Sequence, residues 1–208
     1  MGRNDTPGRV GSPEGQIEGG ELDRHRYNCQ HNNQSSVNVA VHRKDTFLLT
    51  NLQFQSLSKV EGPAFWFLNN LATVKATTES TGGAFSLVHT IAPAGLATPL
   101  HVHYNEDEAF YVVGGAATFF FDGQKTVVEA GGYIFLPRGI PHGVRINGST
   151  RATMLIMAMP GDGFVGMMQE MGERAKERIL PPPTVPDMER LIKVCNKYGI
   201  EVLGPLPD

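Results

Sequence analysis

Three histidines and one glutamate lie in two short stretches whose spacing could bind a metal ion. His101 and His103 are separated by one residue, so a β-strand would send both side chains to the same face. Glu108 follows five residues after His103, and His142 lies in a second stretch. Imidazole nitrogen and carboxylate oxygen are ligands that suit several divalent transition metals. We therefore predict one metal site that is formed by these four residues.

Two further carboxylates, Glu106 and Asp107, compete with Glu108 for the ligand role. We favour Glu108 because it begins the apolar run 109–113, and a strand there would hold its carboxylate toward the interior. Glu106 and Asp107 are expected to face solvent.

Short strands must position these residues. Between residues 63 and 160, apolar runs and turn signals alternate roughly every 8–12 residues, a pattern typical of a sandwich or a barrel. Asp122-Gly123 between two apolar runs is a strong hairpin signal. The expected strands are 65–68, 71–77, 84–91, 108–113, 116–121, 127–128, 133–136, 143–146 and 152–159.

The segments outside this barrel region differ in character. Residues 1–45 are polar and lack periodicity, so we expect a disordered tail. Residues 46–62 read as an extended segment that packs on the barrel or on a partner. Residues 161–208 are expected to be helical, and Pro181-Pro182-Pro183 should end the first of two helices. Apolar side chains recur at helical spacing in both: Phe164, Met167, Met168 and Met171, then Met188, Leu191, Ile192 and Cys195.

Composition narrows the function classes. A net charge of −3 and a pI near 6.2 give no sign of a nucleic-acid partner. Two cysteines far apart in the chain, Cys29 and Cys195, predict no disulfide framework and favour a reducing, cytoplasmic location. No apolar run reaches the roughly 18 residues that a membrane span requires.

The two stretches resemble the two motifs of the cupin family. The first motif is matched by Gly95, His101, His103, Glu108 and Gly115, and the second by Gly131, Pro137, Gly139 and His142. The second motif departs from the family at its last position, where Ile146 stands and Asn147 comes one residue late. The resemblance implies an all-β jelly-roll barrel with C-terminal helices. It also implies that the two histidines of the first motif, its glutamate and the histidine of the second ligate one metal ion.

The chain is similar to single-domain cupins of the quercetin 2,3-dioxygenase type, through residues 106–112, 135–142 and 198–205. This resemblance implies a metal-dependent dioxygenase that acts on an enol or phenol such as a flavonol. Glu108 would take the substrate proton, and dioxygen would be the second substrate. Ligand types leave iron, nickel, manganese, cobalt and zinc open as the single metal of each chain. A non-oxidative isomerase or lyase, and a non-catalytic binding protein, remain alternatives.

Four aromatic residues are candidates for lining the substrate pocket, with ordinary core packing as the alternative. They are Trp66, Tyr104, Tyr111 and Phe119. The apolar residues between 47 and 54, together with the habit of the family, suggest a homodimer.

Overall fold

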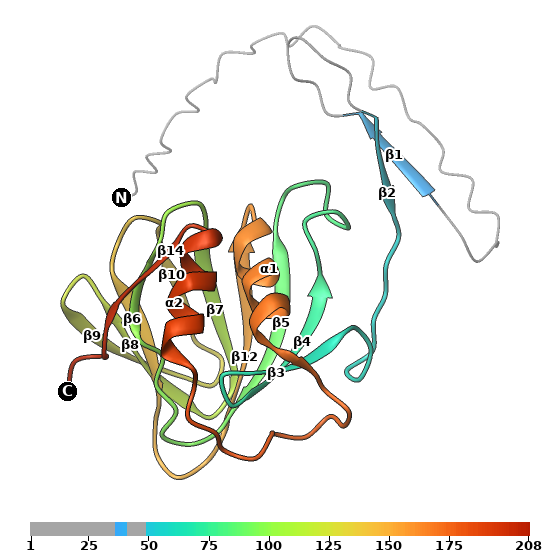
Figure 1. The fold of residues 1–208 in the computed structure, drawn as a ribbon. Helices are drawn as coiled ribbons and strands as arrows, with labels where there is room; N and C mark the ends of the chain where they lie inside the picture. The colour runs from blue at the N-terminus through green and yellow to red at the C-terminus, as the bar shows by residue number, and fades with distance from the viewer. Residues whose placement is uncertain (1–35, 41–48) are drawn as a thin grey trace, which may run out of the picture. The chain divides into compact units, whose positions relative to one another are not determined.

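The computed structural model describes residues 36–40 and 49–208, and within them two antiparallel sheets form a jelly roll (Figure 1). The larger sheet has seven strands in the order β10-β7-β12-β5-β4-β3-β13. The smaller has five, in the order β14-β6-β11-β8-β9. The fold class predicted from the sequence is confirmed.

The strands of the larger sheet are β3 (Ala64–Phe67), β4 (Asn70–Ala76), β5 (Ser86–Ala92), β7 (Asp107–Gly114), β10 (Tyr133–Leu136), β12 (Ala152–Met159) and β13 (Glu173–Arg174). Those of the smaller sheet are β6 (Leu100–His103), β8 (Ala116–Phe121), β9 (Gln124–Glu129), β11 (His142–Ile146) and β14 (Ile200–Gly204). A separate antiparallel pair consists of β1 (Ser36–Ala40) and β2 (Leu49–Gln53).

The core between the two sheets follows from the alternation of side chains along each strand. In β12, every second residue from Ala152 to Ala158 is buried, which is the pattern of a strand with one face on the core. Phe110 of β7 and Phe119 of β8 meet across the two sheets, with ring centroids 5.0 Å apart in an edge-to-face arrangement. Phe110 and Phe119 therefore help to pack the two sheets against each other.

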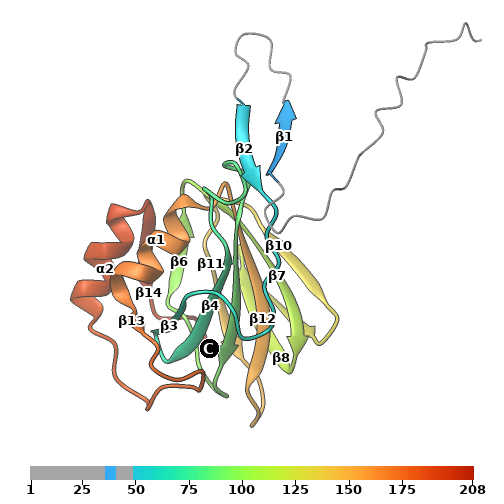
Figure 2. The ribbon, with the colours of Figure 1, turned by 90° about the vertical axis from the view of Figure 1, so that its right-hand side faces the viewer.

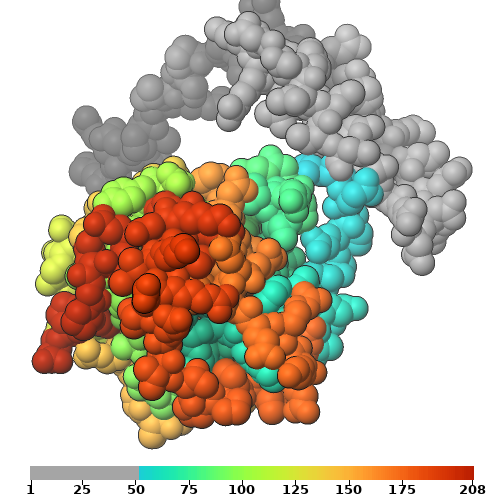
Figure 3. Space-filling model, in the orientation of Figure 1, coloured from blue at the N-terminus to red at the C-terminus, as the bar shows by residue number. Residues whose placement is uncertain are grey.

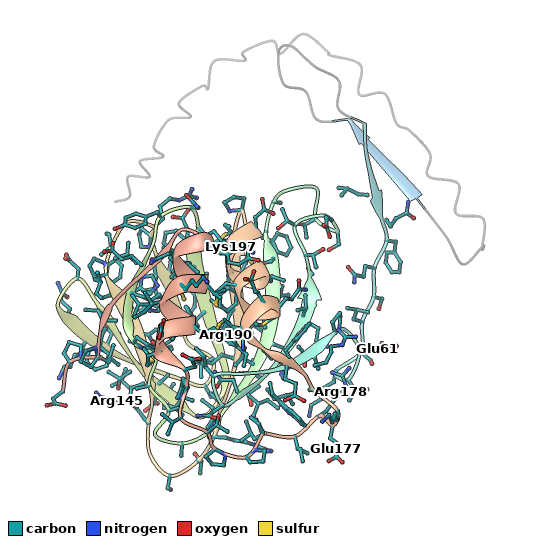
Figure 4. All side chains as sticks on the ribbon, viewed as in Figure 1. Glu61, Arg145, Glu177, Arg178, Arg190 and Lys197 are labelled. Carbon is teal, nitrogen blue, oxygen red and sulfur yellow. The ribbon has the colours of Figure 1, made fainter. Side chains whose placement is uncertain are left out.

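Two helices cover one side of the barrel (Figures 2 and 3). They are α1 (Asp162–Met171) and α2 (Met188–Lys197), and both contribute to an apolar cluster with β3 and β4. Asp187 caps α2 by accepting a hydrogen bond from the backbone N–H of Arg190 at 3.0 Å. Arg190 and Lys197 also reach Glu170 of α1, so charged contacts at the surface join the two helices (Figure 4).

The predicted hairpin at Asp122-Gly123 is confirmed. Phe121 pairs with Gln124 across the turn, and both turn residues have positive φ, at 48° and 73°. This combination is the two-residue loop whose twist matches the strands it joins. Aspartate and glycine tolerate that backbone better than most residues, which explains the strength of the sequence signal.

The C-terminal segment contains more than the two predicted helices. The first helix ends at Met171, ten residues before Pro181, because Gly172 adopts an extended conformation. The chain then adds β13 beside β3 and, after α2, β14 beside β6. Strand β14 thus covers the edge of the strand that carries His101 and His103.

The N-terminal boundaries also differ from the prediction. Strand β1 falls inside the segment 1–45, which we expected to be disordered, while residues 1–35 and 41–45 lie outside the described residues. The stretch 58–61 packs beside β4, where the Lys75 ammonium donates to the backbone carbonyls of Ser58, Lys59 and Glu61. In the part of the chain that the structure describes, no helix is both long enough and apolar enough to cross a membrane.

Candidate metal centre

The structure brings the four predicted ligands together inside the barrel. His101 and His103 come from β6, and His142 comes from β11, where it pairs directly with His101. Glu108 comes from β7 in the opposite sheet. Each residue offers one ligand atom, and these atoms all lie within 4.8 Å of one another. The smaller sheet therefore supplies three histidines and the larger sheet one glutamate to the same cluster.

Backbone carbonyls fix the orientation of two of the imidazole rings. Nδ1 of His101 lies 2.8 Å from the carbonyl oxygen of Pro99, and Nδ1 of His142 lies 2.9 Å from that of Ile140. A carbonyl oxygen can only accept a hydrogen bond, so both Nδ1 atoms carry the proton and donate it. The Nε2 atom of each neutral ring then presents a lone pair, which is the form that binds a metal.

The contact between His142 and Glu108 tests whether a cation fits here. Nε2 of His142 lies 3.2 Å from Oε2 of Glu108. With the Nδ1 proton donated to Ile140, a neutral imidazole and a carboxylate place two lone pairs against each other. Two lone pairs at this distance repel each other in a buried site unless a proton or a cation lies between the two atoms. Nε2 of His103 is 3.8 Å from the same oxygen, so two rings face one carboxylate oxygen.

The ionisation of the cluster is set by its own charges and by burial. Burial alone would raise the pKa of Glu108, but the nearby imidazoles of His103 and His142 lower it to about 2. Burial lowers the pKa of His101 to about 3, aided by the other two histidines. Burial acts in the same direction on His103, but Glu108 and Glu106 outweigh it and raise its pKa. At neutral pH the site therefore offers an ionised carboxylate and a neutral His101.

Glu106 does not face solvent, which corrects the expectation from the sequence. Its side chain is almost fully buried, and its two oxygens accept hydrogen bonds from the backbone N–H groups of Gly163 and Phe164, each at 2.7 Å. These groups belong to the first turn of α1, where unpaired N–H groups and the helix dipole favour a carboxylate. Oε2 also lies 3.7 Å from Nδ1 of His103. That nitrogen is buried and has no hydrogen-bond partner in the described structure.

We expected Asp107 to face solvent, and its side chain is partly exposed. It is held in place by Arg138. Its carboxylate accepts hydrogen bonds from the Arg138 backbone N–H, from Nε and from Nη2, at 2.8–3.0 Å. The hydrogen bonds from this guanidinium lower the pKa of Asp107 below its usual value.

A cavity of about 80 Å³ adjoins the cluster, and only one of the four predicted aromatic residues lines it. Phe119 lies in its wall with Phe110 and Leu136. The side chains of Tyr104 and Tyr111 are 54% and 45% exposed, and Trp66 donates a hydrogen bond to the carbonyl of Ile179. The wall of this cavity thus contains Phe119 but, in the described structure, none of the other three residues, and their role in binding a substrate stays a prediction.

Alternation along β7 explains the position of Tyr111. Glu108, Phe110 and Val112 are buried, whereas Tyr111 and Val113 are exposed. Once Glu108 points inward, Tyr111 must point outward, because side chains alternate along a strand. This alternation could have been read from the sequence.

Comparison with known proteins shows what part of this chain is similar to. Residues 87–158 match the family model described as a cupin domain. Over 102 residues the chain is 34% identical to quercetin 2,3-dioxygenase from Bacillus subtilis, which covers 49% of this chain and 30% of the relative. It is also 32% identical, over 75 residues, to an uncharacterized protein of Methanocaldococcus jannaschii, covering 36% of this chain and 60% of that protein. The chain thus spans less than two thirds of either relative.

One similar solved structure is a predicted oxalate decarboxylase from Thermotoga maritima. It has 19% sequence identity and a TM-score of 0.47, and the match covers 51% of this chain and 98% of that one.

Proposed function

We propose that the protein is a metal-dependent cupin enzyme and that its ion is held by His101, His103, Glu108 and His142. The match of residues 87–158 to the cupin domain model and the clustering of these four side chains support this proposal. We propose further that the enzyme is a dioxygenase acting on an enol or phenol, in line with its similarity to part of quercetin 2,3-dioxygenase. The observation that carries the proposal is the cluster itself: one possible ligand atom from each of the four residues lies within 4.8 Å of the other three, and Nε2 of His142 lies 3.2 Å from Oε2 of Glu108.

The donor set suits a divalent transition metal. Three neutral imidazoles and one carboxylate would leave such an ion with a net charge near +1, and four ligands leave room on an ion that prefers six. His101 is only partly buried, whereas the other three residues are buried. Its side of the cluster is therefore the side from which a substrate would approach.

A bound divalent metal would supply a Lewis acid that makes an enol or phenol more acidic and stabilises the resulting oxyanion. Glu108 has two carboxylate oxygens, so one can serve as a ligand while the other accepts the substrate proton. The apolar wall of Phe110, Phe119 and Leu136 would orient a flat substrate and keep water away from the anion. The carbonyls of Pro99 and Ile140 hold their histidines in the tautomer that this arrangement needs.

The first experiment measures metal content by elemental mass spectrometry in the wild type, a His101→Ala/His103→Ala variant and a His89→Ala control. His89 lies on β5 and is no member of the cluster. The proposal expects about one transition-metal ion per chain in the wild type and in the control, and little in the double variant. Equal metal in all three proteins would contradict the assigned ligands.

The second experiment measures oxygen uptake with 3-hydroxyflavone and with pentane-2,4-dione, using the metal found in the first. Uptake that requires the metal, and is lost in Glu108→Gln, supports the dioxygenase. Substrate turnover under strictly anaerobic conditions would instead indicate an isomerase or lyase. Binding of 3-hydroxyflavone without turnover would indicate a non-catalytic cupin.

We also propose that the protein is cytoplasmic, because its two cysteines predict no disulfide framework, and that it forms a homodimer through the apolar residues between 47 and 54. Light scattering of the full chain tests the assembly, because a monomer mass at micromolar concentration would contradict it.

A further inference from the structure

An apolar groove of about 770 Å³ lies on the outside of the barrel, next to the cavity at the candidate metal centre. Its wall includes Met188, Leu191 and Ile192 of α2 and the C-terminal residues Leu203 and Leu206. Arg145 stands in the same wall and donates a hydrogen bond to the carbonyl of Pro207 (Figure 4). Pockets for drug-sized ligands measure about 300–1,000 Å³. The groove has that size, whereas the inner cavity of about 80 Å³ does not.

Leu68 and Thr98 stand where the groove meets the interior. Both residues line the outer groove, the inner cavity and a second small cavity of about 80 Å³ that reaches His101 and His103. Thr98 is held to β11, because its backbone N–H donates to the carbonyl of Val144 and its hydroxyl accepts from the Val144 N–H, both at 3.0 Å. Thr98 is therefore the fixed side of the opening.

Leu68 lies on the other side of the opening. It is the first residue of the two-residue loop between β3 and β4, where Phe67 pairs with Asn70. Leu68 and Asn69 have φ values of 46° and 64°. Glycine, asparagine and aspartate favour these positions, and a leucine in the left-handed region pays about 1–2 kcal/mol. Asn69 therefore suits the loop better than Leu68 does, and the Leu68 side chain instead packs against the apolar cluster of the two helices, β3 and β4.

Asn69 of the loop is hydrogen-bonded to Thr184, and Leu68 packs against the apolar cluster that the two helices form with β3 and β4. The amide of Asn69 donates to the carbonyl of Thr184 and accepts hydrogen bonds from its backbone N–H and its hydroxyl, at 2.9–3.1 Å. These hydrogen bonds are solvent-exposed, and exposed hydrogen bonds open more readily than buried ones. The structure thus holds Leu68 at the opening by the exposed hydrogen bonds of its neighbour Asn69 and by its own apolar packing.

We infer that Leu68 is a gate between the outer groove and the candidate metal centre, and that it determines which substrates enter. This inference rests on the proposed function for its substrate class. The substrate is a flat, apolar molecule whose enol or phenol end enters the inner cavity while its apolar body stays in the groove. Small enols pass Leu68 as it stands, and larger ones require the loop to swing away from Thr98.

The test measures how fast diethyl pyrocarbonate modifies His101 in the metal-free full-length protein, read by peptide mass spectrometry. His89 is the internal reference, because it lies on β5 outside the cluster. Leu68→Ala is expected to speed modification of His101 about tenfold, which corresponds to about 1.4 kcal/mol of opening free energy. Leu68→Trp should slow it.

Two further variants keep the test decisive. Asn69→Gly keeps Leu68 and suits the positive φ but removes the contact with Thr184, so it should also speed modification of His101. Leu203→Ala is the matched control, because Leu203 lines the outer groove and neither inner cavity. Equal His101 rates in the wild type, Leu68→Ala and Leu203→Ala would overturn the gate. A parallel rise at His89 would also overturn it, since it would mean general loosening.

Oxygen uptake separates this inference from the proposed function. In the metal-loaded protein, Leu68→Ala should lower the KM for 3-hydroxyflavone severalfold and leave that for pentane-2,4-dione unchanged. If no protein consumes oxygen with either compound, the proposed dioxygenase fails, while the modification rates still decide the gate.

Discussion

Asp107 and Arg138 join the two segments that carry Glu108 and His142. Asp107 immediately precedes Glu108 on β7, and Arg138 lies in the loop that leads into β11. The guanidinium and the backbone N–H of Arg138 both bind the Asp107 carboxylate, and Arg138 also donates to the carbonyls of Asn105 and Met159. One arginine thus sets the spacing between a strand of the larger sheet and the loop before a strand of the smaller one.

This pair predicts a pH dependence of stability. The hydrogen bonds from Arg138 lower the pKa of Asp107 in the folded protein below the unfolded value of 3.8. A carboxylate with a lowered folded pKa contributes stability above its unfolded pKa and loses it as the pH falls through the folded pKa. Asp107→Asn should therefore lower the free energy of unfolding at pH 7, and the difference from the wild type should shrink below about pH 4.

Urea denaturation of the metal-free protein at pH 7 and at pH 3 measures this difference. Glu129→Gln removes an exposed carboxylate from β9 and serves as the control. A loss of stability in Asp107→Asn that is the same at both pH values would count against the explanation.

Glu106 is expected to matter both for stability and for metal affinity. Glu106→Ala leaves two N–H groups at the start of α1 without their acceptor and should cost about 3 kcal/mol. Glu106→Gln keeps one carbonyl oxygen and should cost less. Because Glu106 also faces Nδ1 of His103, both variants should weaken metal binding about 10–100-fold.

Chemical denaturation without metal and titration with metal separate these two effects. If Glu106→Gln keeps the wild-type metal affinity, Glu106 supports the fold but does not position His103.

Gly163 is expected to tolerate no side chain. A Cβ atom there would come within 2.9 Å of both Oε2 of Glu106 and the carbonyl oxygen of Tyr198. The Glu106 oxygen is held by hydrogen bonds and the carbonyl is backbone, so neither can move cheaply. Gly163→Ala should therefore lower the free energy of unfolding by about 1–3 kcal/mol, although alanine favours helices.

Gly114→Ala is the matched control, because a Cβ at Gly114 would meet no atom within 4 Å. Thermal unfolding compares the two variants, and Gly163→Ala should have the lower melting temperature. Equal melting temperatures would show that α1 can shift away from Glu106.

Cys195 should be inert in the folded protein. Its side chain lies on the apolar face of α2 and is buried in the cluster with α1, β3 and β4, and this burial raises the pKa of the thiol to about 11. Since the thiolate is the reactive form, iodoacetamide at pH 8 should label Cys195 slowly in the native protein and rapidly in urea. Mass spectrometry of the Cys195 peptide measures this rate, and equal labelling in both states would show that α2 detaches readily.

The spacing of the ligands could be predicted from the sequence because it is a local property. One residue between His101 and His103, and an apolar strand after Glu108, suffice to place all three side chains inside a barrel. The outward face of Tyr111 could have been predicted from the same alternation, since a residue three positions after an inward Glu108 points outward, but we had expected Tyr111 in the pocket. The hairpin at Asp122-Gly123 was equally local.

The role of Glu106 could not be predicted, because its partners lie 57 and 58 residues away at the start of α1. Next to Asp107 and Glu108, its type alone suggested a solvated charge. The pairing of β14 with β6 depends in the same way on contacts between distant segments. Long-range packing decided both features, and neither leaves a periodic signal.

The two sheets contribute different ligands to one point, and this has a thermodynamic consequence. An ion held by Glu108 from one sheet and by histidines from the other would respond to the separation of the sheets, which Phe110 and Phe119 help to set. Affinity for the ion and the free energy of unfolding of the barrel are then linked, so a change in one must be accompanied by a change in the other. Core residues that never touch the ion would tune how tightly it is held.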